Sequence, residues 1–298
     1  METAYVAVIG AGPAGIAAAV QLKRSGLQPL LFEKNVAGGL LRNAHWVENY
    51  PGFPNGISGP ALAAHMSKHL DVLNIPILTE EVVQLDFDKN KTMFKILTGA
   101  KEYVASRVVV ASGTRPCRLR QTEGLAGHLE RKVFYEVDAI RDAGNKHVVI
   151  VGAGDAAFDY ALNLASTGSN RVTIIYRGVE IKALPLLCAR VQEKTNIALL
   201  EQTEIVAIGQ GDEDNLRLEI QTAGRQTVIP CDYVLAAVGR EAEKYYYSRC
   251  LMDLEVELIA RDLLLPVGDV TNGLFRQASI AVGNGVEAAM RVCRRIKE

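Results

Sequence analysis

One short motif near the amino terminus limits the fold more than any other part of the sequence. A β-rich apolar run, residues 5–9, leads into Gly10-Ala11-Gly12-Pro13-Ala14-Gly15, and an alanine-rich helical pattern follows over residues 16–24. A strand, a glycine turn and a helix in this order are typical of an α/β unit that binds a dinucleotide. In such a unit the first glycine allows the tight turn, the second lets the pyrophosphate approach the backbone, and the third lets helix and strand pack closely.

A carboxylate stands where a dinucleotide site needs one. A second apolar run, residues 29–32, ends at Glu33 and Lys34. Glu33 lies about twenty residues beyond Gly10, the spacing at which an acidic side chain accepts hydrogen bonds from the ribose hydroxyls. The helix that starts after Gly12 would meet the phosphates with free N–H groups and the positive end of its dipole.

The same pattern occurs a second time. Residues 147–151 form a strand-like run, Gly152-Ala153-Gly154-Asp155-Ala156-Ala157 a second glycine turn, and residues 158–166 a helical pattern. Residues 171–177 form the next strand. Two such units in one chain predict two nucleotide sites in an α/β protein.

Composition sets few further limits. The 298 residues are enough for two domains, and the net charge of −1 gives no field that attracts nucleic acid or a membrane surface. No apolar run approaches the length of a bilayer span, and the amino terminus has no basic and apolar signal region, so we expect a cytoplasmic protein. The five cysteines are scattered without a CxxC pair or metal-ligand spacing, so we predict no metal site.

Several motifs together resemble the low-molecular-weight thioredoxin reductase family, and in part its relatives, the thioredoxin-reductase-type ferredoxin–NADP reductases. The resemblance covers nearly the whole chain. Its motifs are the first glycine turn with Glu33, Val47-Glu48-Asn49-Tyr50-Pro51-Gly52, Ser58-Gly59-Pro60, Ala111-Ser112-Gly113, the second glycine turn, Gly268-Asp269-Val270 and Arg276-Gln277-Ala278.

The resemblance implies an α/β fold with two Rossmann-like domains of the three-layer ββα type. The FAD-binding domain would comprise residues 1–114 and 245–298, and the NAD(P)H-binding domain, residues 115–244, would be inserted into it. A homodimer is also implied.

The resemblance further implies two sets of cofactor-binding residues. Those expected at FAD are Gly10, Gly12, Pro13, Ala14, Gly15, Glu33, Lys34, Gly39, Leu40, Asn49, Val82, Ser112, Gly113, Gly268, Asp269, Arg276, Gln277 and Ala278. Those expected at NADPH are Gly152, Gly154, Asp155, Ala156, Arg177, Lys182 and Gly239. Leu40 stands where the family usually has a glutamine, which removes one polar contact from the expected FAD site.

The sequence departs from the thioredoxin reductase pattern at its redox centre. Where that family carries its CxxC, this chain has Glu136-Val137-Asp138-Ala139. Disulfide exchange needs a thiolate that attacks a sulfur, so we expect no thioredoxin reduction by the family mechanism. The same stretch is similar to the ferredoxin–NADP reductases. Two other features are closer to the thioredoxin reductases: the place where the sequence stops, and the motif Arg276-Gln277-Ala278. Hydride transfer between the two cofactors needs no side-chain acid or base, so we name no catalytic residue.

The residues after the second strand of the second unit bear on the choice of nicotinamide. Arg177 and Lys182 fall on two positions where NADPH-dependent family members carry arginines, and no carboxylate stands at the strand end. Cations there favour the 2′-phosphate of NADPH over NADH.

Three hypotheses for the activity remain open at this point. We favour transfer of electrons from NADPH through FAD to a small redox carrier protein, ferredoxin or flavodoxin. The alternatives are a reductase or oxidase of a small molecule such as a quinone, a free flavin or a dithiol, and a flavin-binding electron-transfer subunit that does not use NAD(P)H. Tyr245, Tyr246 and Tyr247 are interpreted as packing residues, with flavin shielding or partner docking as the alternative.

Overall fold

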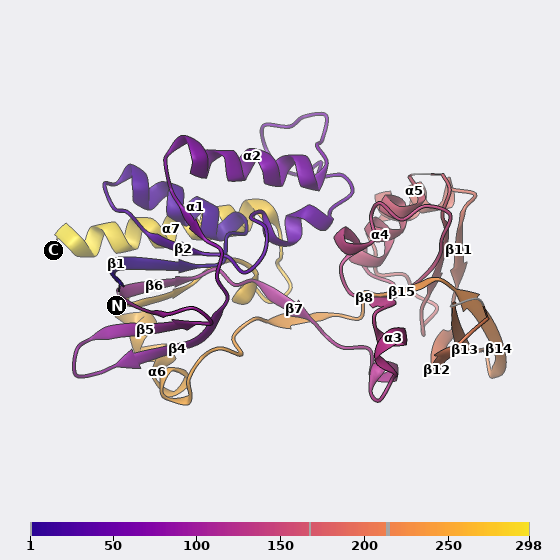
Figure 1. Ribbon diagram of the computed structural model, residues 1–298. Coiled ribbons are helices and arrows are strands. Elements are labelled where there is room, and N and C mark those ends of the chain that lie inside the picture. The colour runs from indigo at the N-terminus through magenta and orange to yellow at the C-terminus, as the bar shows by residue number, and fades with distance from the viewer. Residues whose placement is uncertain (1, 167, 213–214, 298) are drawn as a thin grey trace. The chain divides into compact units, whose positions relative to one another are not determined.

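The chain folds into two compact units. The computed structural model describes residues 2–166, 168–212 and 215–297. Unit 1 consists of Met1–Arg42, Val47–Arg115 and Glu241–Glu298, and unit 2 of Asn43–Trp46 and Pro116–Arg240 (Figure 1). The two connections between the units, β7 (Thr114–Pro116) and β16 (Arg240–Ala242), pair as a two-stranded sheet. Each unit is described by itself below.

Unit 1 is built on a seven-stranded sheet. Its order is β3-β2-β1-β6-β5-β4, with β17 paired to the second half of β6. The strands are β1 (Glu2–Ile9), β2 (Leu30–Phe32), β3 (Ile77–Leu78), β4 (Val82–Asp88), β5 (Met93–Thr98), β6 (Glu102–Val110) and β17 (Leu264–Pro266). The strands β1, β2, β3, β6 and β17 run parallel, whereas β4 and β5 form an antiparallel hairpin beside β6.

Alternation along β1 gives unit 1 its three layers. Val6 and Val8 pack into a core with helices on one face, while Ala7 and Ile9 pack into a second core on the other face, because successive side chains of a strand point to opposite sides. The helices of the first core are α1 (Pro13–Arg24), α2 (Gly59–Val72) and α7 (Ala278–Lys297), and that of the second is α6 (Arg249–Ala260). Ser58 caps α2 by accepting a hydrogen bond from Ala61 N.

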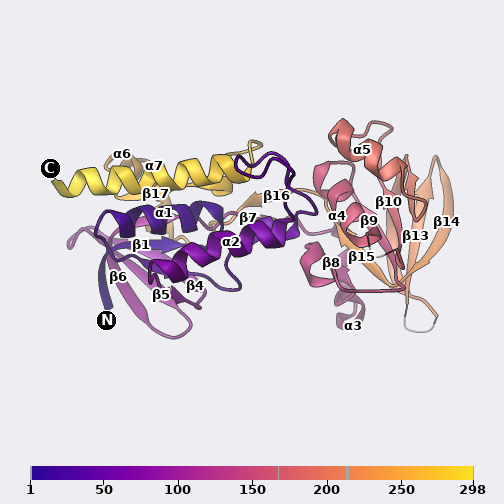
Figure 2. The same cartoon turned by 90° about the horizontal axis from the view of Figure 1, so that it is seen from above.

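Helices α1 and α7 lie side by side across the sheet (Figure 2). Small residues permit this approach: a Cβ at Gly285 of α7 would lie 2.1 Å from the carbonyl oxygen of Ala14 in α1. The last helix of the chain therefore packs directly on the helix that follows the first glycine turn.

Unit 2 has a five-stranded parallel sheet of order β11-β10-β9-β15-β8. One face packs on helix α4, through Phe158 and Leu164, and the other on a three-stranded antiparallel sheet, through Leu216 and Leu218. The elements are β8 (Val133–Phe134), β9 (His147–Val151), β10 (Arg171–Ile175), β11 (Ile197–Leu200), β12 (Thr203–Gln210), β13 (Leu216–Thr222), β14 (Arg225–Cys231), β15 (Tyr233–Ala236), α3 (Gly127–Glu130), α4 (Asp155–Ala165) and α5 (Pro185–Gln192). The predicted class, α/β with two Rossmann-like sheets, is confirmed.

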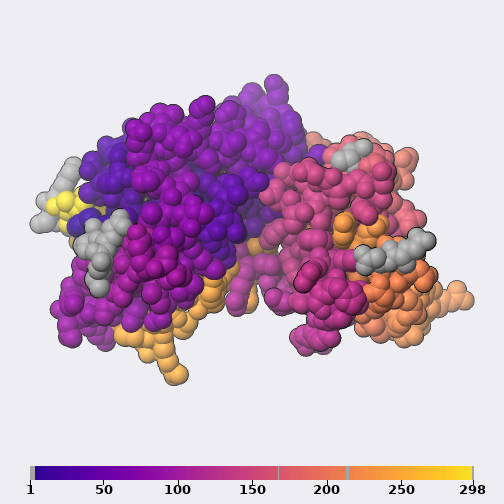
Figure 3. All heavy atoms as spheres, in the orientation of Figure 1, coloured from indigo at the N-terminus to yellow at the C-terminus, as the bar shows by residue number. Residues whose placement is uncertain are grey.

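Short 3-10 turns complete the chain. The segment before β17 contains helix α6, which the sequence patterns do not predict. The turns are η1 (Gly39–Asn43), η2 (Arg120–Thr122), η3 (Val137–Ala139) and η4 (Gly268–Val270). Helix α6 follows the tyrosine run, of which Tyr246 and Tyr247 are buried in the second core of unit 1. In the space-filling view, the visible atoms of unit 1 belong mostly to the amino-terminal part of the chain, in indigo and purple (Figure 3). Among the described residues, no helix is long and apolar enough to cross a membrane.

Candidate dinucleotide sites

The first glycine turn has no room for side chains at two of its positions. Gly10 has a φ of +100°, and a Cβ there would lie 2.4 Å from the carbonyl oxygen of Ala111. A Cβ at Gly15 would lie 1.8 Å from the carbonyl oxygen of Gly10. Helix α1 begins directly after Gly12, whose position as N-cap provides no side-chain cap. The amino-terminal end of α1 is therefore available to an anion such as a pyrophosphate.

Glu33 is fixed at the end of β2. Its Oε2 accepts a hydrogen bond from Ala11 N at 2.9 Å, and its Oε1 accepts one from Asn35 N at 2.9 Å. Each carboxylate oxygen has a second lone pair, so the group remains able to accept from two ribose hydroxyls. The first turn thus holds the carboxylate that the motif requires.

A pocket of about 70 Å³ lies at the carboxyl ends of β1 and β2. It brings together Gly10, Glu33, Lys34, Val82 and Ser112 of the residues predicted to bind FAD. The remaining lining residues are Ile9, Phe32, Glu80, Glu81, Glu243, Tyr245 and Tyr246. The carboxyl edge of a doubly wound sheet is where such folds bind ligands.

Two acidic side chains of this pocket have partners of their own. Glu80 accepts hydrogen bonds from Thr98 Oγ1 at 2.6 Å and Tyr103 OH at 2.7 Å, and these bonds hold its pKa below the usual value. Glu81 accepts one from Tyr245 OH at 2.6 Å, and this bond, with burial, raises the pKa of Tyr245 to about 12. The pocket is consequently rich in hydrogen-bond acceptors.

The other residues predicted at FAD also lie in unit 1, in four further places. Pro13 and Ala14 open α1, and Gly268 approaches Ala14 so closely that a Cβ on Gly268 would lie 2.9 Å from the Ala14 Cβ. Gly39 and Leu40 begin η1, and Gly39 packs against Gly12. Asp269 lies in η4, and Gly113 follows Ser112 after β6.

The start of α7 holds the last of the predicted FAD residues. Asn49 Nδ2 donates a hydrogen bond of 2.8 Å to Gln277 Oε1, which links the loop after η1 to the residue before Ala278. Arg276 precedes Gln277. The contacts of all these residues with FAD stay predictions.

The sequence patterns missed the acidic and aromatic side of the pocket. Glu80 and Glu81 come directly before the predicted Val82, and Glu243 lies two residues before Tyr245, the first of the tyrosine run. The one sequence signal that could have pointed to Glu243 is its position shortly after Gly239, because the chain re-enters unit 1 at Glu241.

The second glycine turn repeats the first with looser surroundings. Gly152 has a φ of +145°, and a Cβ there would lie 2.6 Å from the carbonyl oxygen of Ala237. Gly154 is the N-cap residue of α4, and a Cβ added to it would have no heavy atom within 4 Å. Asp155 and Ala156 form the first turn of α4.

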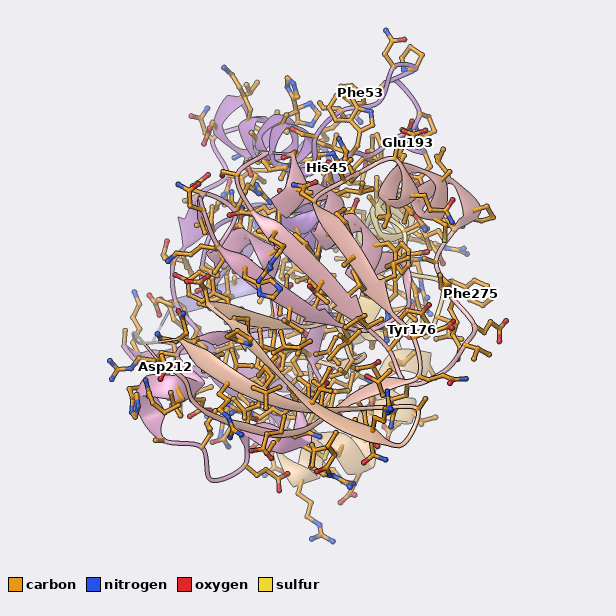
Figure 4. The ribbon with its side chains drawn as sticks, turned by 90° about the vertical axis from the view of Figure 1, so that its right-hand side faces the viewer. His45, Phe53, Tyr176, Glu193, Asp212 and Phe275 are labelled. Atoms are coloured by element: carbon orange, nitrogen blue, oxygen red, sulfur yellow. The ribbon has the colours of Figure 1, made fainter. Side chains whose placement is uncertain are left out.

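The loop after β10 is tied back to this second turn. Lys182 N donates a hydrogen bond of 2.8 Å to the carbonyl oxygen of Ala153, and Asp155 Oδ1 accepts one of 2.8 Å from Leu184 N. Tyr176, labelled in Figure 4, directly follows β10 and is buried, and Arg177 after it is exposed. Gly239, the last predicted residue, accepts a bond from Cys117 N through its carbonyl at 2.9 Å. The structure therefore places Lys182 beside the glycine turn through its backbone.

Glu136 is held by a polar cluster in unit 2. Arg240 donates to its Oε1 at 2.5 Å, and Asn43 Nδ2 and Tyr160 OH donate to its Oε2 at 2.6 and 3.3 Å. Asp138, in the following turn η3, donates its N–H to Asn43 Oδ1. The segment is thus fixed by carboxylate and amide contacts.

Neither metal ligands nor paired thiols gather in the described part of the chain. No group of three or more His, Cys, Asp or Glu side chains that could hold a metal ion occurs there. All five cysteines lie in described ranges, and each is free.

The chain belongs to the pyridine nucleotide-disulphide oxidoreductase family, whose model matches residues 4–285. It is therefore an oxidoreductase of that class. Among individual proteins it is similar to the thioredoxin reductase of Treponema pallidum, at 32% identity over 97% of this chain and 96% of the relative. Crystal structures of the thioredoxin reductases of Lactococcus lactis and T. acidophilum match with TM-scores of 0.85 and 0.83, at 25% and 26% identity. These matches cover 99% of both chains and 100% of both chains, respectively.

The thioredoxin reductase family uses FAD and NADPH, and the residues of unit 1 fit FAD. The turn at Gly10 and Gly15 excludes side chains, α1 offers an uncapped end, and Glu33 stands at the strand end beside a pocket. These are the features that bind the adenosine and pyrophosphate of a dinucleotide.

Proposed function

We propose that this protein passes electrons from NADPH through FAD to a small one-electron carrier protein, ferredoxin or flavodoxin, without a redox disulfide. The observation that carries the proposal is the segment at 136–139. By the resemblance to thioredoxin reductases, this segment corresponds to their CxxC; here Glu136 is held by Arg240, Asn43 and Tyr160. Glu136, which these contacts hold in place, replaces a thiol that would have to attack a disulfide and later act as a leaving group.

The role of each unit follows from its own residues. In unit 1, the Gly10 turn and Glu33 would hold FAD, which accepts two electrons and can release them one at a time. In unit 2, the Gly152 turn would take the pyrophosphate of NADPH, and Arg177 and Lys182 its 2′-phosphate. The protein's task is to orient the two cofactors and to exclude water from between them.

An exposed apolar pair supports an external protein acceptor. Leu274 is 93% exposed and Phe275, labelled in Figure 4, is 76% exposed, directly before the predicted flavin residue Arg276. Large apolar side chains gain most when a partner covers them. Seating of the carrier on this pair belongs to the proposal.

The first experiment is an anaerobic titration of the purified holoenzyme with NADPH and then with NADH, following bleaching of the flavin. Rapid bleaching by NADPH alone is expected. The reduced enzyme is then mixed with ferredoxin or flavodoxin from the same organism, and reduction of the carrier is followed by its absorbance. If neither nicotinamide bleaches the flavin, or if no carrier is reduced while quinones, free flavins or dithiols are, the proposal is wrong.

A paired variant separates carrier docking from flavin reduction. Replacing Leu274 and Phe275 by Ser is expected to lower the rate of carrier reduction and to leave bleaching by NADPH unchanged. The matched control is Val256→Ser on α6, which is 84% exposed and lies elsewhere in unit 1. Equal effects of the two replacements on carrier reduction would contradict docking at residues 274 and 275.

A further inference from the structure

We infer that Glu243 is a specificity residue of unit 1 that accepts a hydrogen bond from the exocyclic amino group of the FAD adenine. The inference rests on the use of FAD by the family and not on the identity of the electron acceptor. It concerns a residue outside all the glycine and aspartate motifs.

The backbone of Glu243 is fixed beside the turn that ends β6. Its N–H donates a hydrogen bond of 3.0 Å to the carbonyl oxygen of Gly113, and its carbonyl oxygen accepts one of 2.6 Å from Ser112 Oγ. Glu243 is one of the residues that line the same pocket as Glu33 and Phe32. These two hydrogen bonds hold the backbone of Glu243 against residues 112 and 113 at the wall of the pocket.

One oxygen of the Glu243 carboxylate is buried without a hydrogen-bond partner among the described residues. Glu243 is 7% exposed, and the oxygen without a partner is its Oε1. Lys34, the cation that lines this pocket, lies 3.7 Å from Glu81 instead. Because an unpaired buried acceptor destabilises a fold, a persistent one at a pocket wall indicates a donor supplied by a ligand.

The rest of the pocket defines that donor. Phe32, Tyr245 and Tyr246 provide aromatic walls, which suit a flat base. The carboxylates around them repel a phosphate and accept from N–H and O–H groups. Glu33 stands at the position that takes the ribose hydroxyls, so the donor left for Glu243 is the amino group of adenine.

The test compares FAD with deamino-FAD, in which a carbonyl oxygen replaces the adenine amino group. Holoenzyme is incubated with an equal, excess mixture of the two until exchange is complete, and the bound flavins are separated by chromatography. Wild type is expected to prefer FAD by about 10- to 100-fold, the range for a hydrogen bond to a charged group. Glu243→Ala and Glu243→Gln are expected to bring the ratio within about threefold of unity, since neither retains the charge.

The two variants reach that ratio by different routes. Ala removes the acceptor and weakens FAD, whereas Gln can accept from the amino group or donate to the carbonyl and so strengthens deamino-FAD. Should the Ala variant lose its flavin, the Gln variant still decides the question. The matched control is Glu241→Ala in β16, two residues before Glu243; the Glu241 side chain forms an exposed ion pair with Arg115 at 2.8 Å.

Three results would overturn the inference. One is a wild-type preference for FAD that persists in both Glu243 variants. Another is an equal loss of affinity for both flavins, which would make Glu243 a structural residue. The third is the same fall in the ratio on Glu241→Ala, which would make it an indirect effect of charge.

Discussion

The two glycine turns share a motif but not an environment. In unit 1 a Cβ on Gly39 would lie 3.1 Å from the Cα of Gly12, and Gly268 approaches Ala14 from another segment. In unit 2 the corresponding glycine, Gly154, has nothing within 4 Å of its Cβ position. Loops from distant parts of the chain crowd the second glycine position of the first turn, whereas the same position of the second turn is open. This difference suits a cofactor that stays bound in unit 1 and a nucleotide that must enter and leave unit 2.

The charges beside the two turns differ as well. Strand β2 ends at Glu33, which suits ribose hydroxyls, while the loop after β10 carries Arg177 and Lys182. Helix α1 has no acidic residue in its first turn, whereas α4 has Asp155. Identical backbone motifs thus present different groups to their ligands, and the variants below test each difference.

The largest effect is expected from Gly15→Ala. The new Cβ would lie 1.8 Å from the carbonyl oxygen of Gly10, and a backbone atom cannot move aside as a flexible side chain does. We expect a loss of stability at the upper end of the usual 1–3 kcal/mol for overpacking, or more, with loss of bound FAD. Urea unfolding and the ratio of flavin to protein absorbance measure the two effects.

The position that corresponds to Gly15 in the second turn is already Ala157, so the control for Gly15→Ala is the same substitution at Gly154, the second glycine of that turn. The new Cβ at residue 154 would enter open space. The free energy of unfolding is therefore expected to stay within about 0.5 kcal/mol of wild type, and the flavin content to stay unchanged. Equal destabilisation by the two variants would show that the first turn is no more enclosed than the second.

The next effect concerns the nicotinamide. Arg177→Ala and Lys182→Ala are each expected to raise the KM for NADPH by about 10- to 100-fold, because each would remove the charged hydrogen bond to the 2′-phosphate that we propose. The KM for NADH is expected to stay unchanged, since NADH lacks that phosphate. Steady-state kinetics with both nucleotides measure this.

A charge-matched control is Arg217→Ala, whose exposed side chain pairs with Glu219 at 2.6 Å on β13. It should leave both KM values as they are. A rise in the KM for NADH equal to that for NADPH in Arg177→Ala or Lys182→Ala would contradict recognition of the 2′-phosphate.

Periodicity and glycine spacing predicted the layout of both units because these signals are local. The glycine turns with their flanking strands and helices follow from neighbours in sequence. Each of these strands and helices begins and ends within three residues of its predicted range.

The acidic wall of the FAD pocket was beyond such patterns. Glu243 reaches the pocket because the segment after β16 returns beside Gly113, more than a hundred residues away in sequence. Helix α6 and the burial of Tyr246 and Tyr247 depend in the same way on packing against β4 and β17. Contacts between remote segments leave no periodic trace in one sequence.

A smaller effect is expected on α4, whose first two turns are more acidic than those of α1. Burial, together with the nearby Asp155, raises the pKa of Asp159 to about 6 from 3.8, although its carboxylate accepts from His45 N at 2.8 Å. A raised pKa favours folding below about pH 4, and this contribution is lost as the pH rises through about 6. Asp159→Asn keeps an acceptor without the charge.

This variant should therefore raise the Tm by about 2–4 °C at pH 7.5, for about 1 kcal/mol, and leave it unchanged near pH 4. Thermal unfolding followed by circular dichroism at the two pH values measures the change. An equal shift of Tm at both pH values would show that the charge of Asp159 is not its cause.

The smallest effect is expected from the thiols, which are unpaired in unit 1 and unit 2 alike. Burial raises the pKa of Cys231 to about 12, so it is not a thiolate at neutral pH, and it can stay in place. Replacing the other four cysteines, Cys117, Cys188, Cys250 and Cys293, by Ser should leave the NADPH-driven rate of carrier reduction within about twofold of wild type. Spectrophotometric rates with the carrier measure this. A rate that falls at least tenfold while NADPH still bleaches the flavin would mean that electrons leave through a thiol, and the proposed route without a disulfide would have to be abandoned.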